Sequence, residues 1–243
     1  MSASVLDVLF YGLVTALATG LGAIPFVWAR GGSPRAVAYA NAIASGLMLG
    51  ASFELMAEGS RHGSGATVAG AAAGVAFILA AERLLAAHPV ELGALVGERS
   101  RRALLVLLVM TVHSFAEGVA VGVAFGGGEI LAAQITLAIA VHNVPEGLAI
   151  SAALRSRGAP ILSCAGWSVF SSLPQPLMAV PAFAFVEAFA PILPYGLGFA
   201  AGAMVFMVLV ELLPEAYGEA RRDAIGLLVT VSLVAMILTQ KLL

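Results

Sequence analysis

Two copies of one short pattern contain half of the histidines in this sequence. His113-Ser-Phe-Ala-Glu117 is followed, 29 residues further on, by His142-Asn-Val-Pro-Glu146. Residues four apart lie one turn above each other on the same face of an α-helix, so each pair can direct an imidazole and a carboxylate into one space. Two carboxylates offset the charge of a divalent cation, and two neutral imidazoles add nitrogen ligands. This set suits Zn²⁺ and its first-row neighbours better than Mg²⁺ or Ca²⁺, which prefer oxygen ligands throughout.

The composition indicates that lipid surrounds the elements that carry these residues. Of the 243 residues, 60% are hydrophobic and 11% are charged, and the mean hydropathy is +1.00. A soluble domain carries about 25% charged residues, so the polar surface here is too small to cover a water-soluble globule. A net charge of −2 without a basic stripe argues against a nucleic-acid partner. The single cysteine, Cys164, excludes an internal disulfide and a cysteine-rich metal site.

Eight segments are long and apolar enough to be transmembrane helices, which need about 20 mostly apolar residues. Charged, glycine and proline clusters separate them, and they are roughly Val5–Trp28, Ala36–Ala57, Gly65–Ala87, Ala103–Phe125, Ile130–Leu154, Pro160–Val186, Tyr195–Tyr217 and Ala224–Gln240. The first lacks the basic start of a signal peptide, so we expect a permanent helix. The longest connection, around 88–102, has about 15 residues, so residues 1–243 are predicted to form a single transmembrane domain.

The arginines indicate how the segments are oriented, because basic residues accumulate in cytoplasmic loops. If the segments alternate in direction, the connections on one side carry ten arginines, namely Arg30, Arg35, Arg83, Arg99, Arg101, Arg102, Arg155, Arg157, Arg221 and Arg222. The other side carries only Arg61 and Lys241. The sequence therefore predicts an all-α membrane protein of eight transmembrane helices with both termini extracytoplasmic.

The two motifs fall near the middle of the fourth and fifth segments, which a short turn joins in antiparallel order. Small adjustments of tilt would bring His113 level with Glu146, and Glu117 level with His142. The result would be a ring of four ligands, with approximate two-fold symmetry, between these two helices. An ionised group at the bilayer centre costs several kcal/mol unless it is paired, so four titratable groups at one depth favour a functional role. The alternative is that they only hydrogen-bond neighbouring helices together.

At these residues the sequence resembles a known family. HSFAEGVAVG (113–122) and HNVPEGLAIS (142–151) are similar to the fourth and fifth helices of the ZIP family of zinc and iron transporters. TGLGAIP (19–25), SGLMLGASFEL (45–55) and AAGAMVFMVLVELLPEA (200–216) are similar to the first, second and seventh helices of that family. The resemblance implies a usually homodimeric, eight-helix protein of the cell membrane that imports divalent metal ions toward the cytoplasm.

The resemblance also implies which residues bind the metal. Mapped by motif, the primary ligands are His113, Glu117, His142 and Glu146. Met48 of the second helix is a candidate sulfur neighbour. Many members have a second, adjacent metal site built from the residues after the two motif histidines and a sixth-helix carboxylate; here these positions hold Ser114, Asn143 and Gln175. Because Gln175 replaces the carboxylate, we expect one strong metal site that includes Asn143, with Ser114 and Gln175 along the transport path.

Other polar residues lie closer to the predicted segment ends. Glu211 and Glu215 lie at the cytoplasmic end of the seventh segment and could receive the departing ion, and Glu211, which lies deeper, is assigned to the transport path. Glu54 and Glu58 lie at the outer end of the second segment and could attract the ion. His62 could be an entry ligand or a surface histidine, and the surface interpretation is favoured. A solvated or interfacial helix end is the simpler interpretation of five acids, namely Glu58, Glu82, Glu187, Glu215 and Glu219.

These observations favour a transporter that works by alternating access. Its substrate would be Zn²⁺, with Fe²⁺, Mn²⁺, Cd²⁺ and Co²⁺ as alternatives, and no resident cofactor is expected. A passive metal-selective channel remains an alternative, because gating leaves no mark on a sequence. An intramembrane metalloenzyme is disfavoured, since the His-Glu-x-x-His spacing of zinc proteases is absent, and no catalytic residue is assigned. Metal release would leave the carboxylates without a counter-charge and favour their protonation, so we expect proton linkage.

Overall fold

The computed structural model describes residues 4–28, 33–87, 98–126 and 128–242, and within these ranges every regular element is a helix. In chain order the α-helices are α1 (Val5–Gly20), α2 (Pro25–Trp28), α3 (Pro34–Ala87), α4 (Glu98–Gly126), α5 (Glu129–Arg155), α6 (Ile161–Ser172), α7 (Pro174–Ala184), α8 (Val186–Phe189), α9 (Leu193–Met207), α10 (Leu213–Glu219) and α11 (Arg222–Leu242). A 3₁₀ turn (η1, Leu21–Ala23) joins α1 to α2, and a π-helical turn (η3, Val208–Leu212) joins α9 to α10. The prediction of an all-helical protein is confirmed.

Six stretches of helix in the described residues are long and apolar enough to cross a membrane. They are Val5–Val27, Pro34–Leu85, Ala103–Gly126, Glu129–Arg155, Leu193–Glu219 and Arg222–Leu242. The molecule is therefore a multi-pass membrane protein. The count differs from the eight predicted segments at two places in the chain.

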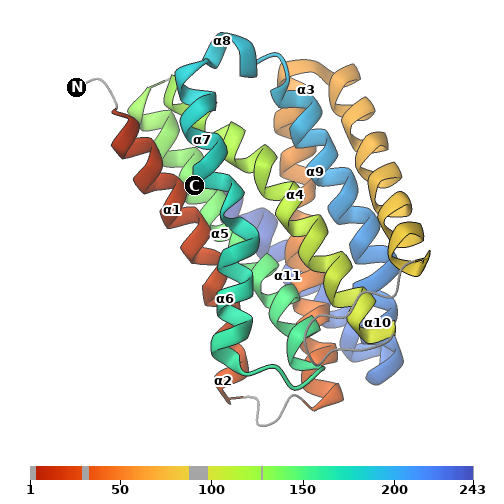
Figure 1. The fold of residues 1–243 in the computed structure, drawn as a ribbon. Coiled ribbons are helices and arrows are strands. Elements are labelled where there is room, and N and C mark those ends of the chain that lie inside the picture. Colours follow the sequence, from red (N-terminus) through yellow and green to blue (C-terminus); the bar gives the residue numbers. More distant parts are fainter. Residues whose placement is uncertain (1–3, 29–32, 88–97, 127, 243) are drawn as a thin grey trace.

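The first difference lies in α3, which combines the second and third predicted segments in one element of 54 residues. Gly63 departs from helical dihedral angles (φ 163°, ψ 98°) and separates α3 into two arms. Figure 1 shows the second arm turning back in the opposite direction to the first, on the other side of α9 in this view. The second difference lies in the sixth predicted segment, where Pro174 interrupts the helix and leaves α6 with 12 residues and α7 with 11.

Local sequence signals define where several helices begin. Ser4 caps α1 reciprocally with Asp7: the Asp7 backbone N–H donates to the Ser4 hydroxyl at 3.2 Å, and the Ser4 backbone N–H donates to the Asp7 carboxylate at 2.8 Å. Pro25, Pro34 and Pro174 each begin a helix, where the missing N–H of proline has no intrahelical partner to lose. Local sequence therefore accounts for where these helices start.

Small residues let α3 approach α9 and α11 closely. Gly74 faces the backbone of α9 at Phe199, and Gly46 faces the backbone of α11 at Val229. A side chain at either glycine would overlap that neighbouring backbone. Close contacts of this kind hold helices together in lipid, where apolar burial gives little driving force for association.

The motif helices lie inside this arrangement. α5 contacts α1, α3 and α4, while α4 also packs along α7 (Figure 1). The C-terminal half of α5, from His142 to Leu154, is almost entirely buried. Gly147 of α5 meets the backbone of α1 and η1 at Thr19 and Gly22 so closely that no side chain would fit between them. Neighbouring helices therefore hold α4 and α5 on several sides.

Candidate metal centre

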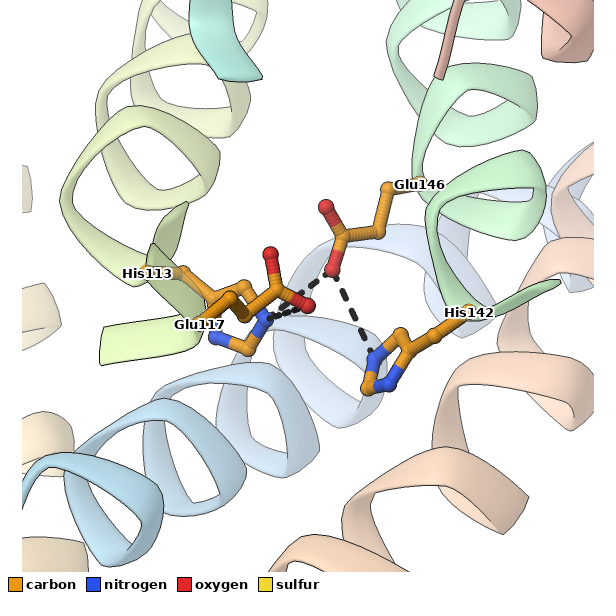
Figure 2. Close-up of side chains that lie close together, drawn as sticks. All are labelled: His113, Glu117, His142 and Glu146. Carbon is orange, nitrogen blue, oxygen red and sulfur yellow. Dashed lines mark ion pairs between the residues drawn. The ribbon is translucent and has the colours of Figure 1, made fainter. Parts of the chain in front are cut away.

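The four motif side chains converge between α4 and α5. Figure 2 shows His113 and Glu117 pointing from one helix toward Glu146 and His142 on the other. Nε2 of His113 lies 3.0 Å from Oε1 of Glu146 and 3.3 Å from Oε1 of Glu117, and Nε2 of His142 lies 3.5 Å from Oε1 of Glu146. One ligand atom from each of the four residues lies within 4.8 Å of the others. We call these four side chains the central cluster.

The sequence predicted a symmetric ring, and the arrangement in the structure is only partly symmetric. His113 pairs with Glu146 across the two helices, as the antiparallel register required. No ion pair joins Glu117 to His142 in the described part of the chain. Glu146 instead lies between the two imidazoles, which are 5.7 Å apart at their ring centres. The Glu146 carboxylate is therefore the central acid of the cluster.

Most polar atoms of the central cluster take part in no well-aligned hydrogen bond among the described residues, although three nitrogen–oxygen pairs in the cluster lie 3.0 to 3.5 Å apart. The atoms without such a bond are both ring nitrogens of His113, Oε1 of Glu117, Nε2 of His142 and both carboxylate oxygens of Glu146. All four residues are buried, with at most 3% of their surface exposed. Buried polar atoms nearly always have partners, because leaving them without one costs free energy. This concentration of nitrogen and oxygen atoms that could ligate a metal fits a bound cation.

The separations in the cluster also match those of zinc ligands. Zinc binds nitrogen and oxygen at about 2.0–2.2 Å with tetrahedral geometry, so two of its ligands lie about 3.4 Å apart. The three nitrogen–oxygen distances in the cluster are 3.0, 3.3 and 3.5 Å. The four side chains could therefore ligate one ion after small rotations.

The second oxygen of Glu117 belongs to a hydrogen-bonded network that extends to α1 and α7. Nε2 of Gln175 donates to Oε2 of Glu117 and, at 3.2 Å, to Oδ1 of Asn143. Nδ2 of Asn143 donates to Oε1 of Gln175 at 2.9 Å and to the Thr15 carbonyl at 2.7 Å. The amides of Asn143 and Gln175 thus satisfy each other. Asn143 lies beside the central cluster, and its role as a metal contact stays a prediction.

Two other predicted site residues, Ser114 and Met48, are fully buried in the structure. The hydroxyl of Ser114 has no hydrogen-bond partner within the described ranges. Met48 lies in the apolar core with Met110 and Ile150. The predicted roles of Ser114 on the transport path and of Met48 as a sulfur neighbour stay predictions.

Two cavities lie at opposite ends of the helices. The first, which we call the His142 cavity, has a volume of about 320 Å³, and its lining includes His142 of the central cluster with Glu54, Glu58 and His62 of α3. The second, the Glu211 cavity, has a volume of about 370 Å³ and is lined by residues that include Arg157, Glu211, Glu215 and Glu219. The first arm of α3 contributes its C-terminal end to the first cavity and its N-terminal end, at 34–38, to the second. The acids that the sequence associated with the two segment ends therefore line two separate cavities.

Three further contacts could not be found from the sequence. The Thr15 contact to Asn143 uses a backbone carbonyl, which no side-chain pattern reveals. The contact of Gln175 with Glu117 joins residues 58 positions apart, although the resemblance had singled out Gln175 itself. The hydrogen bond from Asn41 to Glu215, at 3.2 Å, ties α3 to α10. By contrast, Glu187 is exposed on α8 and Glu82 is half-buried on α3, as expected for residues at helix ends.

These features define the class of the molecule: a multi-pass helical membrane protein with a buried cluster of two histidines and two glutamates between adjacent helices. A family model described as ZIP zinc transporter matches residues 90–239. The chain is 32% identical over 249 residues to the zinc transporter ZupT of Corynebacterium aurimucosum, with 92% of this chain and 93% of that protein covered. The chain belongs to the ZIP zinc transporter family.

Two longer relatives match as well. The chain is 44% identical over 237 residues to a candidate zinc transporter of Arabidopsis thaliana, with 96% of this chain and 38% of that protein covered. It is 47% identical over 128 residues to zinc transporter ZIP11 of Homo sapiens, with 49% of this chain and 37% of that protein covered. The matched regions thus span little more than a third of the length of these two relatives.

Proposed function

We propose that this protein carries divalent transition-metal ions, zinc first among them, across a cell membrane into the cytoplasm. The observation that carries the proposal is the central cluster, in which four buried ligand atoms of the types that zinc prefers lie within 4.8 Å of one another. The names of the relatives support zinc as the substrate. The metal is cargo, and its ligands are His113, Glu117, His142 and Glu146.

The proposed topology has eight crossings in a single domain, residues 1–243, with both termini extracytoplasmic. The break at Gly63 supports counting the two arms of α3 as two crossings. The immediate succession of α6 and α7 supports counting them as one. Under this topology the His142 cavity faces outward, the Glu211 cavity faces inward, and the central cluster lies near the bilayer midplane. A homodimer in the cell membrane completes the proposal.

Transport would proceed by alternating access to the central cluster. An ion reaches Nε2 of His142 from the His142 cavity, and the carboxylates of Glu117 and Glu146 offset its double charge. After the rearrangement the ion leaves toward the Glu211 cavity, where the acidic lining offers oxygen ligands. Ser114 and Gln175 line the path beside the cluster, and protons replace the ion on the carboxylates as it leaves.

The test is zinc uptake by proteoliposomes that contain the purified protein and a trapped zinc-sensitive dye. We expect Glu146→Gln and His142→Ala to reduce uptake at least about 100-fold, because each removes a ligand from a site buried away from water. Glu187→Gln is the matched control, since it removes an exposed carboxylate from α8. Unchanged flux in the two cluster variants would refute the proposal. Saturation at a low turnover distinguishes a carrier from a channel in the same assay.

A further inference from the structure

We propose that Glu58 and His62 form a second metal site, a capture site at the mouth of the His142 cavity, which binds a divalent transition-metal ion before it reaches the central cluster. This inference rests on the proposed transport function and adds a step to it. Three of the four histidines in the sequence have a glutamate four residues away, and His62 is the one outside the paired motifs. The chemistry of the capture site is therefore that of one half of the central cluster.

The geometry of this pair matches that of the central cluster. Nε2 of His62 lies 3.1 Å from Oε1 of Glu58, within the range of 3.0 to 3.5 Å that separates nitrogen from oxygen in the cluster. Two ligands of one zinc ion lie about 3.4 Å apart, so a small opening of the pair admits an ion. His62 is the last residue of the first arm of α3 before the break at Gly63. The pair therefore lies at the end of this arm.

The cavity connects the pair to a buried ligand. His62, Glu58 and Glu54 line the same cavity of about 320 Å³ as His142. His142 is 3% exposed, and its Nε2 has no hydrogen-bond partner in the described part of the chain. A buried histidine and a more exposed His–Glu pair that line one cavity give a cation a route between them. Glu54, one turn from Glu58, adds a carboxylate to the lining of the same cavity.

The exposure of the pair suits transient binding. The side chain of His62 is 45% exposed and that of Glu58 is 30% exposed, whereas the central cluster is buried. Two protein ligands leave the remaining positions on the ion to water, so binding is weaker than at a four-ligand site and the ion can move on. The site would therefore raise the local metal concentration at the cavity mouth and speed loading of the cluster.

Arg61 limits how tightly the pair can bind. Its Nη1 lies 2.9 Å from Oε2 of Glu58, on the carboxylate oxygen that His62 does not contact. The guanidinium neutralises part of the Glu58 charge and repels an arriving cation. Removing it leaves both carboxylate oxygens for the metal. The structure therefore predicts opposite effects for substitutions at adjacent positions, His62 and Arg61.

The experiment measures initial zinc uptake by proteoliposomes as a function of zinc concentration. We expect His62→Ala and Glu58→Gln to raise the half-saturating concentration about tenfold and leave the maximal rate unchanged, because the capture site acts before the transport step. Arg61→Gln should lower the half-saturating concentration. Glu187→Gln, which removes an exposed carboxylate from α8, should change neither quantity.

Binding of Co²⁺ alone, measured by its visible absorption, tests the site without transport. In a background that removes all four ligands of the central cluster (His113→Ala, Glu117→Gln, His142→Ala and Glu146→Gln) we expect weak Co²⁺ binding to remain and to disappear when His62→Ala is added. Retention of that binding after His62→Ala would overturn the proposal. So would an uptake defect confined to Glu58→Gln that vanishes at high salt, because it would mean charge attraction without coordination.

The two proposals fail in different ways. If the central-cluster variants transport normally, the proposed function is wrong. If those variants are inactive while His62→Ala and Arg61→Gln both behave like the unsubstituted protein, only the capture site is wrong.

Discussion

The two His–Glu pairs of the central cluster, one on α4 and one on α5, have the same residue types and spacing but different surroundings. The α4 pair is enclosed: His113 is fully buried, and Oε2 of Glu117 accepts a hydrogen bond from Gln175. In the α5 pair, His142 lines a cavity, and Oε1 of Glu146 lies 3.0 Å from Nε2 of His113 and 3.5 Å from Nε2 of His142. The repeat thus supplies equivalent residue types, and the neighbouring helices enclose the α4 pair while they leave His142 of the α5 pair at a cavity.

The largest expected difference between the pairs concerns their acids. Glu146→Gln should weaken zinc binding at least about 100-fold, because it removes the carboxylate that lies between both imidazoles. The loss of zinc affinity in Glu117→Gln should be about tenfold smaller than in Glu146→Gln, since Gln175 already donates a hydrogen bond to one oxygen of Glu117. Isothermal titration calorimetry on the detergent-purified variants measures both affinities. Equal losses would show that the hydrogen bond to Gln175 does not distinguish the two acids.

The next difference concerns access to the two imidazole positions. His142→Cys should react with a hydrophilic methanethiosulfonate at least about tenfold faster than His113→Cys, because only position 142 lines the His142 cavity. Mass spectrometry of the modified protein gives the two rates. The unsubstituted protein is the control, since its single cysteine, Cys164, is buried. Similar rates at both positions would mean that the α4 pair is as accessible as the α5 pair.

Gln175 should act through one pair only. Gln175→Leu is expected to weaken zinc binding about tenfold, as loss of a hydrogen bond that orients a ligand does. Adding Gln175→Leu to Glu117→Gln should weaken zinc binding little further, while adding it to Glu146→Gln should weaken binding by its full effect. Zinc affinities of the single and double variants give the two double-mutant cycles. Equal coupling energies with both acids would show that Gln175 orients the whole cluster and not Glu117 alone.

The smallest expected difference is in proton release. Protons and metal compete for the same carboxylate and imidazole atoms, so zinc affinity should rise with pH and fall as pH is lowered. Each Glu→Gln substitution should reduce the number of protons released on zinc binding by at most about one. The reduction should be larger for the acid that is protonated to a greater extent in the metal-free protein. Calorimetry in buffers of different ionisation enthalpy counts these protons. A count that neither substitution changes would mean that the carboxylates take no part in proton linkage.

Much of the fold followed from local sequence. The apolar composition required helices in lipid, since every backbone polar group must be satisfied within the span. The register of His113 with Glu146 followed from two helices joined by a short turn, because antiparallel neighbours bring the middles of their segments together. The reversal at Gly63 falls inside the predicted connection between the second and third segments, but the helix continues up to it on both sides instead of ending in a loop. The division of the sixth segment into α6 and α7 at Pro174 was not predicted.

The sequence by itself determined the ligand types, their spacing of four and their position within two apolar segments, because these depend on helix periodicity and composition alone. Only the tertiary structure decided that Glu146 lies between both imidazoles, that Gln175 engages Glu117, and that His142 lines a cavity. Those outcomes depend on side chains from helices far apart in sequence. A local pattern fixes which face a residue occupies, and it does not fix which neighbour covers that face.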